Sequence, residues 1–338
     1  MTIQAILKID KLGSQWETLD PFLVCAYHND AYPKGNSELG PAAPLAGHNL
    51  GRDFVGKDGW RMYFGLTVPG FPSHPHRGFE TVTVVRKGLI DHSDSLGASA
   101  RFGEGDVQWL TAGRGIVHAE MFPLLNSDEP NPLELFQIWL NLPARHKMTD
   151  PHFTMFWSKD IPRHLSTDSR RGVTEVVCIA GSMTATARPP VPPPHSWASD
   201  PSADLAIWTI KMSPGAHWSL PPALASDTRR KLYFFKGTNL TINGQLVDQQ
   251  SAIEVFSTSD VELINGTEPS ELLMLQGRPI GEPVAQHGPF VMNSDEELRR
   301  AYADYHLTKF GDWSWPNNAP VHGANRKRFA RHADGRVE

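Results

Sequence analysis

The sequence predicts an all-β protein of two strand-rich barrels followed by one helix near the C-terminus. The 338-residue chain contains 28 glycines and 28 prolines, a content that suits short strands and tight turns better than long helices. Alternating segments rich in β-branched residues recur along the chain, as in Phe79–Val85 (FETVTVV). Turn clusters such as Asp94–Gly97 (DSLG) separate these segments, at the roughly 8–12-residue spacing that is typical of barrels and sandwiches.

The predicted strands fall into two blocks. In chain order they are Phe79–Val85, Val107–Leu110, Leu133–Asn141, Val173–Ile179, Leu205–Lys211, Lys231–Phe235 and Ala252–Phe256. The strand pattern lapses at Asn141–His152 (NLPARHKMTDPH). We therefore expect an N-terminal barrel in residues 1–150, and a C-terminal barrel, a helix and a basic tail in residues 151–338.

The helix is predicted where the sequence reads NSDEELRRAYADYHLTKFG, from Asn293. Ser294 is a suitable N-cap, Glu297 stands at the capping-box position, and Gly311 is a natural end for the helix. One face carries mostly apolar and aromatic side chains at helical spacing, namely Leu298, Tyr302, Tyr305 and His306. We expect this face to pack on a barrel.

Two further segments have an unusual composition. Arg188–Ser202 (RPPVPPPHSWASDPS) is rich in proline and is interpreted as an extended surface loop. The run from Asn325 (NRKRFARHADGRVE) is basic and is interpreted as a frayed, solvated terminus. A patch for nucleic-acid contact or nuclear targeting is the alternative for this basic run.

Charge and composition argue against several classes of protein. The 32 Lys and Arg residues against 37 Asp and Glu residues give a net charge of -5, which argues against direct binding of nucleic acid. No apolar run is long enough to cross a membrane, and the first residues lack the pattern of a secretory signal. Cys25 and Cys178 are too few for a disulfide framework or a thiolate zinc site. We expect a cytoplasmic protein, with the nucleus as the alternative in a eukaryote.

The strongest chemical signal is the pair of motifs His74-Pro-His76 and His118-Ala-Glu120. Residues two apart on a strand point to the same face, so two such pairs on neighbouring strands would bring four side chains together. Three imidazoles and one carboxylate suit Fe(II), Mn, Co, Ni or Zn and leave coordination positions open for small molecules. The residues alone do not decide between these metals, and an ordinary set of barrel histidines is the alternative.

Other residues are weaker candidates for the same site. Glu80 is counted on the face of His74 and His76, so it could replace Glu120 as the carboxylate or orient a ligand. Trp109 and Phe122 are interpreted first as barrel core and second as a wall of the substrate pocket. Gln137 is either a hydrogen-bonding group of the pocket or a satisfied core amide. The histidines interpreted as surface or turn residues are His92, His152, His164, His195, His287 and His306.

Longer runs around these motifs resemble the pirin family of bicupins. The runs are His74–Val85 (HPHRGFETVTVV), Gly105–Phe122 (GDVQWLTAGRGIVHAEMF), Phe136–Pro143 (FQIWLNLP) and Gly281–Asn293 (GEPVAQHGPFVMN). The resemblance covers most of the chain and implies two cupin barrels, which are double-stranded β-helices of the jelly-roll type. It also implies one mononuclear Fe(II)/Fe(III) ion in the N-terminal barrel, and a second barrel without a metal. Carried over by position, the ligands would be His74, His76, His118 and Glu120, with Glu80 near the metal.

The resemblance implies two functions of different classes. One is a quercetinase-type dioxygenase that adds O2 to a flavonol or a related small aromatic molecule, with Glu120 or Glu80 as the base for the substrate hydroxyl. The other is an iron-dependent redox-sensing regulator, a transcription cofactor that binds a protein partner without catalysis. We prefer the enzyme, with other divalent metals (Mn, Co, Ni, Cu or Zn) as alternatives to iron.

Two segments depart from the family pattern. Gly35–Gly59 is interpreted as an insertion, and the proline-rich loop Arg188–Ser202 is unusual. Both are expected to shape the mouth of the pocket, so the native substrate need not be quercetin.

Overall fold

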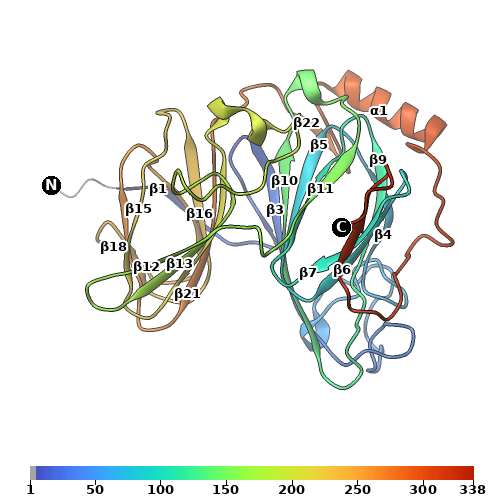
Figure 1. Ribbon diagram of the computed structural model, residues 1–338, viewed down its shortest axis with the longest axis horizontal. Helices are drawn as coiled ribbons and strands as arrows, with labels where there is room; N and C mark the ends of the chain where they lie inside the picture. The colour runs from blue at the N-terminus through green and yellow to red at the C-terminus, as the bar shows by residue number, and fades with distance from the viewer. Residues whose placement is uncertain (1–4) are drawn as a thin grey trace. The chain divides into compact units, whose positions relative to one another are not determined.

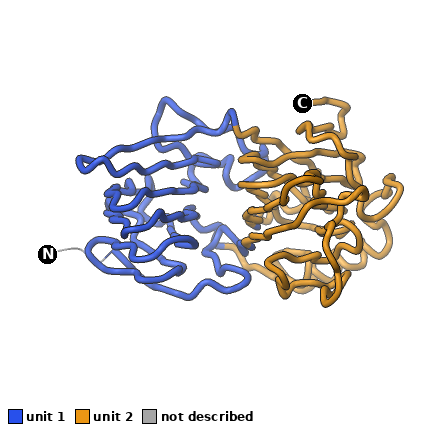
Figure 2. The backbone as a smooth tube through the Cα atoms, turned by 90° about the horizontal axis from the view of Figure 1, so that it is seen from below, with its two compact units in different colours: residues 1–26, 139–141, 159–281 blue, residues 27–138, 142–158, 282–338 orange. Residues whose placement is uncertain are grey.

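The computed structural model describes residues 5–338, which form two compact units (Figure 2). Unit 1 contains the residues up to Ala26 together with Trp139–Asn141 and Lys159–Gly281, and unit 2 contains Tyr27–Ile138, Leu142–Ser158 and Glu282–Glu338. Strands dominate both units, which confirms the all-β class. The units interleave along the chain, whereas the sequence prediction divides it once, near residue 150. The difference arises because the first strand pairs with a late one, β19 (Ser251–Val255), and the chain after Gly281 returns to unit 2.

Unit 1 holds two antiparallel sheets around one apolar core. The larger sheet has the order β1 (Ile6–Lys11), β19, β16 (Arg229–Lys236), β21 (Ser270–Gly277), β14 (Ala206–Met212), β13 (Val173–Ala180) and β12 (Arg163–Thr167). The smaller sheet has the order β15 (His217–Leu220), β20 (Val261–Ile264), β17 (Leu240–Ile242) and β18 (Gln245–Val247). Trp208, Leu232 and Leu263 meet in the core from both sheets, because alternate residues of each strand point inward.

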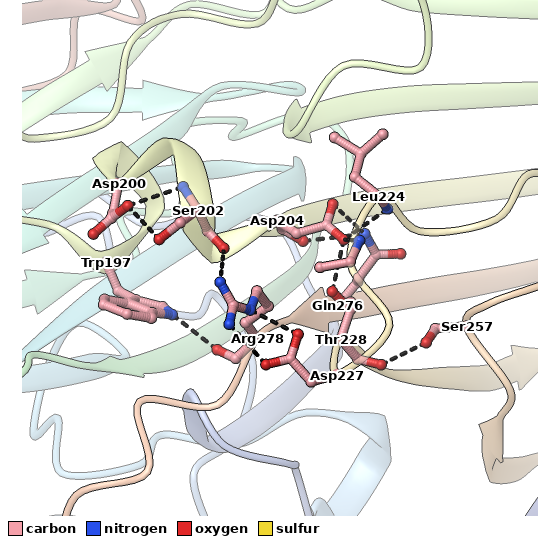
Figure 3. A network of polar contacts seen from close by, with 11 residues as sticks. Trp197, Asp200, Ser202, Asp204, Leu224, Asp227, Thr228, Ser257, Gln276 and Arg278 are labelled. Atoms are coloured by element: carbon pink, nitrogen blue, oxygen red, sulfur yellow. Dashed lines mark hydrogen bonds and ion pairs between the residues drawn. The ribbon is translucent and has the colours of Figure 1, made fainter.

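A polar network fixes the proline-rich loop Arg188–Ser202 to unit 1 (Figure 3). The indole of Trp197 donates a hydrogen bond to the carbonyl of Arg278 at 2.9 Å. The guanidinium of Arg278 in turn donates to the carbonyl of Ser202 at 3.1 Å and pairs with both oxygens of Asp227 at 2.8 Å. The loop is therefore anchored at its C-terminal end, although its proline content predicts only an extended surface segment.

Asp204, two residues after this loop, is the centre of further contacts in this network (Figure 3). One carboxylate oxygen accepts hydrogen bonds from the backbone N–H groups of Leu224 and Ala225 at 2.8 and 3.1 Å, and from the Thr228 hydroxyl at 2.6 Å. The amide of Gln276 donates to the other oxygen at 3.2 Å. Charged acceptors make hydrogen bonds stronger than neutral ones, so Asp204 ties the loop before β14 to the turn before β16.

Asp204→Ala is expected to lower the free energy of unfolding by about 2 kcal/mol, because the donors lose their charged acceptor. Asp227→Ala is the matched control, since its ion pair with Arg278 is exposed to solvent and should contribute little. Urea denaturation measures both variants. Equal loss of stability in the two variants would contradict the role assigned to Asp204.

Unit 2 also holds two antiparallel sheets. The first has the order β24 (Phe329–Arg331), β7 (Ser99–Gly103), β6 (Leu89–Asp94), β9 (Ile116–Met121) and β4 (Gly70–His76). The second has the order β11 (His152–Phe156), β8 (Val107–Thr111), β5 (Phe79–Lys87), β10 (Asn131–Asn141), β3 (Phe22–Tyr32) and β2 (Gln15–Trp16), of which β2 and the ends of β3 and β10 belong to unit 1. Ile90 and Phe102 of one sheet pack with Val85, Leu110 and Leu135 of the other. Every strand predicted from the sequence is a strand in the structure.

The helix α1 (Asp295–Thr308) lies in unit 2 beside the hairpin of β22 (Ala285–His287) and β23 (Phe290–Met292) (Figure 1). Its predicted capping box is confirmed, because the Ser294 side chain accepts from the Glu297 N–H and the Glu297 carboxylate accepts from the Ser294 N–H. The buried side chains of Leu298 and Ala301 pack with Phe290. The remaining helices are the short 3-10 turns η1 (Lys57–Gly59), η2 (Ala144–His146), η3 (Trp197–Ser199) and η4 (Pro201–Ala203). No helix within residues 5–338 is both long enough and apolar enough to cross a membrane.

The basic C-terminal run forms a strand, so the predicted fraying is wrong, although most of its residues are exposed to solvent as predicted. Its strand β24 pairs with β7 and completes an edge of the first sheet of unit 2, with Ala330 buried. The guanidinium of Arg328 pairs with the buried carboxylate of Asp106 at 2.9 Å. Arg101 of β7, itself fully buried, donates to the carbonyl of Gly323 at 2.8 Å. Basic composition did not predict the strand, and the Arg328 side chain has a carboxylate partner although it is partly exposed.

Candidate metal centre

Two neighbouring strands of unit 2, β4 and β9, carry the two histidine motifs (Figure 1). The strands are antiparallel, and His74 lies directly opposite His118 in their register. The three imidazoles of His74, His76 and His118 converge, and their potential ligand atoms all lie within 4.8 Å of one another. The structure therefore brings together the three histidines that the sequence pattern selects.

Backbone carbonyls fix the orientation of two of these imidazoles. Nδ1 of His74 lies 2.8 Å from the carbonyl oxygen of Pro72, and Nδ1 of His76 lies 3.4 Å from that of Pro289. A carbonyl only accepts, so each Nδ1 carries the proton and each Nε2 keeps its lone pair when the ring is neutral. Burial lowers the pKa of both rings below the ordinary value, so they are neutral at physiological pH. Neutral imidazoles in this tautomer are suited to bind a metal through Nε2.

His118 is completely buried, and neither of its ring nitrogens has a hydrogen-bond partner among the described residues. Its ring centroid lies 4.5 Å from that of His74 and 4.9 Å from that of His76. Burial and these neighbouring rings hold the pKa of His118 well below its usual value. Buried polar groups are normally paired, so this residue is costly to the fold unless something binds it. A metal ion at the centre of the three rings fits this need.

Glu120 adds a buried carboxylate beside the three imidazoles. Its Oε2 atom lies 3.9 Å from Nε2 of His118. From the facing sheet, the Gln137 amide donates to Oε2 at 2.6 Å and the Thr83 hydroxyl donates to Oε1 at 3.3 Å. The centre therefore lies between the two sheets of unit 2, and Glu120 is held in place by two donors. Of the two interpretations offered for Gln137, its contact with Glu120 favours a hydrogen-bonding group of the site.

Glu80 and Trp109 lie on the other face of the second sheet. Strand neighbours alternate between faces, and Thr83 points to the metal centre, so Glu80 points away from it. The Thr111 hydroxyl donates to Glu80 on that far face at 2.7 Å, and Trp109 is two residues from Thr111 on the same strand. The prediction that Glu80 shares a face with His74 and His76 assumed one continuous strand. It is wrong because the chain turns at Gly78 and continues in β5, a strand of the other sheet.

A narrow crevice of about 180 Å³ adjoins the metal centre. It is lined by His28, Phe71, Thr83, Ile90, Glu120, Phe122, Leu135 and Gln137. Phe122 thus belongs to the hydrophobic core and also lines the crevice, so it fits both predictions made for it, barrel core and pocket wall. The crevice does not admit a sphere the size of a water molecule, so it is too narrow for a small molecule in this conformation. A ligand therefore enters only when side chains of the wall move.

His92 is the histidine that sequence reasoning placed wrongly, because it is fully buried rather than at the surface or in a turn. It lies on β6, a central strand of its sheet, and its ring centroid is 5.6 Å from that of His118. Nε2 of His92 lies 3.0 Å from the carboxylate of Asp94. The strand β6 has the polar sequence LIDHSD, so no hydrophobic pattern marked it as buried.

These features define a class of protein. Two units, each with antiparallel sheets around an apolar core, and a histidine-rich centre between the sheets of one unit, are those of a bicupin. The chain belongs to the pirin family of this class, as the family resemblance predicts. The Pirin family model matches residues 10–140, and the model of the Pirin C-terminal cupin domain matches residues 207–311.

Individual relatives support the same assignment. Human pirin is 35% identical over 254 residues, which cover 72% of this chain and 78% of human pirin. A Pseudomonas aeruginosa protein named "Putative quercetin 2,3-dioxygenase PA2418" is 35% identical over 242 residues, which cover 71% of this chain and 79% of that protein. The crystal structure of a quercetin 2,3-dioxygenase from Acinetobacter baumannii shares the fold, with a TM-score of 0.70 at 24% identity over 91% of this chain and 98% of that one.

The wild-type protein is expected to gain stability when Fe(II) is added anaerobically, and His118→Ala is expected to lose most of this gain. A ligand at a hundred times its Kd stabilises a folded protein by about 2.7 kcal/mol. His306→Ala is the control, because His306 is exposed on α1 of the same unit. Thermal unfolding with metal and with a chelator measures the metal-dependent shift of each protein. An equal shift in wild type and His118→Ala would place the metal elsewhere.

Proposed function

We propose that this pirin-family protein is a mononuclear metal enzyme of the quercetin 2,3-dioxygenase type, with iron as its metal. Its substrate is a flavonol or a related small hydroxylated aromatic molecule. The observation that carries the proposal is the convergence of three neutral imidazoles, with His118 left unpaired, beside the carboxylate of Glu120. The Pseudomonas aeruginosa relative named for this activity supports the reaction type.

In this proposal His74, His76, His118 and Glu120 hold the metal. Three imidazoles and a carboxylate suit Fe(II), Mn, Co, Ni or Zn, and iron is chosen for the proposed redox chemistry with O2. A bound metal would supply Lewis acidity toward the substrate hydroxyl and redox chemistry with O2. The carbonyls of Pro72 and Pro289 keep the lone pairs of two imidazoles available for it.

The protein's own side chains orient the substrate and move its proton. Glu120 is the base for the substrate hydroxyl, because it lies at the crevice and Glu80 faces away. The donors Gln137 and Thr83 each use one lone pair on a different oxygen of Glu120, so each oxygen keeps a second lone pair, one for the proposed metal and one for the proton. Phe71 and Phe122 form an aromatic wall of the crevice that excludes water and suits a planar ring.

The proposal is tested by oxygen uptake. Protein loaded anaerobically with Fe(II), with its metal content measured, is mixed with quercetin in air-saturated buffer. We expect O2 consumption that matches flavonol loss one to one, and none in His76→Ala, because that variant lacks one of the proposed ligands. His306→Ala serves again as the control with an intact centre.

No O2 uptake by fully loaded wild-type protein with quercetin or a simpler hydroxylated aromatic would contradict the enzyme. The regulator then becomes the better function. Its own signature is a protein partner retained by the Fe(III) form and released by the Fe(II) form, or the reverse, since such coupling requires different affinities in the two states.

A further inference from the structure

Outside the four proposed ligands, a chain of hydrogen bonds runs from the crevice into the protein through His28. Nδ1 of His28 lies 2.7 Å from the hydroxyl of Tyr63. The same hydroxyl donates to Oδ2 of Asp30 at 2.7 Å, and Oδ1 of Asp30 pairs with the Arg61 guanidinium at 3.0 Å. Tyr63 and Asp30 are both buried. The proposed function uses none of these residues.

The direction of this chain fixes the tautomer of His28. Burial raises the pKa of Asp30, but the adjacent Arg61 cation keeps its carboxylate ionised at neutral pH, so Asp30 accepts the only hydroxyl proton of Tyr63. The Tyr63 oxygen can then only accept from His28, which puts the ring proton on Nδ1. Burial, together with Arg61, lowers the pKa of His28 to about 4, so the ring is neutral. The hydrogen bond to Tyr63 uses Nδ1, so Nε2 is the ring nitrogen that carries the lone pair.

Tyr63 is held in this position by its backbone. Its φ angle is 56°, a left-handed conformation that is rare for a bulky aromatic residue and that often marks a functional site. Two hydrogen bonds to Asp53 keep it there, with N–O distances of 3.0 Å and 2.8 Å. Asp53 belongs to the segment Gly35–Gly59, which the sequence analysis interprets as an insertion. This segment therefore positions the tyrosine that orients His28.

His28 belongs to the wall of the crevice that Glu120 and Gln137 also line. Its ring centroid lies 5.8 Å from that of Phe71, which lies 6.3 Å from that of His74. A planar small molecule that widened the crevice would thus have the proposed metal-binding residues at one of its ends and His28 along its side.

We propose that His28 contacts the substrate, with Nε2 accepting a hydrogen bond from a hydroxyl of a small hydroxylated aromatic ligand. This inference deepens the proposed function, because it rests on the substrate binding at the histidine centre. Tyr63 is a positioning residue, which acts through His28. The fixed acceptor selects hydroxylated ligands, because a methyl ether at the same position cannot donate.

The tautomer of His28 is tested first, by nitrogen NMR of histidine-labelled protein without metal, with His28→Gln to assign the signal. We expect a protonated Nδ1 and an unprotonated Nε2 at neutral pH. Tyr63→Phe is expected to abolish this preference. Tyr32→Phe is the matched control, because its hydroxyl donates to the backbone carbonyl of Arg61 and not to His28. A protonated Nε2 in the wild type, or the same response to both variants, overturns the positioning role.

Ligand contact is tested by anaerobic binding of quercetin and catechol, each against its methylated counterpart, to metal-loaded protein. His28→Phe keeps a ring but has no acceptor, so we expect its Kd for the hydroxylated probes to rise about tenfold. His28→Gln, which restores an acceptor, is expected to recover part of the affinity. The Kd of the methylated probes should not change, and the metal content should match the wild type.

These measurements separate the two proposals. If the wild-type protein does not bind metal, the proposed function fails. The tautomer of His28 can still be measured, because that experiment uses protein without metal. If His28→Phe binds the hydroxylated probes as tightly as the wild type, or if the wild type binds them no better than their methylated counterparts, His28 does not contact the substrate.

Discussion

The pairing of β4 with β9 is the constraint on which the candidate site depends. Their antiparallel register sets His74 opposite His118 and brings Glu120 to the same face. A slip of one residue would turn one strand's ligands to the other side. Gly70 permits the close pairing, since a Cβ atom there would lie 2.5 Å from the carbonyl oxygen of Glu120. The register of these two strands thus determines which side chains lie together at the candidate metal site.

Around β4 and β9, other parts of the protein fix the orientation and the protonation state of the candidate ligands. Backbone carbonyls select the imidazole tautomers, the facing sheet holds Glu120 by Gln137 and Thr83, and burial keeps the rings neutral. His28 is oriented in the same manner by the hydroxyl of Tyr63, whose backbone is hydrogen-bonded to Asp53. In both sets an acceptor oxygen holds the ring proton on Nδ1, so Nε2 is the nitrogen that the two proposals assign to a ligand.

The sequence predicted what depends on local spacing. The two His-containing pairs and the capped helix could be found because strand and helix periods are short-range properties. Glu80 was misplaced because the turn at Gly78 restarts the period in another sheet. His28 and His92 lie on strands with polar residues among apolar ones, which obscure the pattern. The basic tail gave no sign of β24, because three residues that complete a sheet edge are selected by their partner strand. Long-range pairing carries no comparable local signal.

The central claim is that four residues of unit 2 hold one metal ion. Anomalous diffraction at the metal edge, from crystals of protein loaded with one divalent metal, tests it most directly. We predict a single strong peak bonded to the imidazole nitrogens of His74, His76 and His118 and to a carboxylate oxygen of Glu120. A peak elsewhere, or full occupancy by a metal that leaves His118 without a bond, would contradict the account.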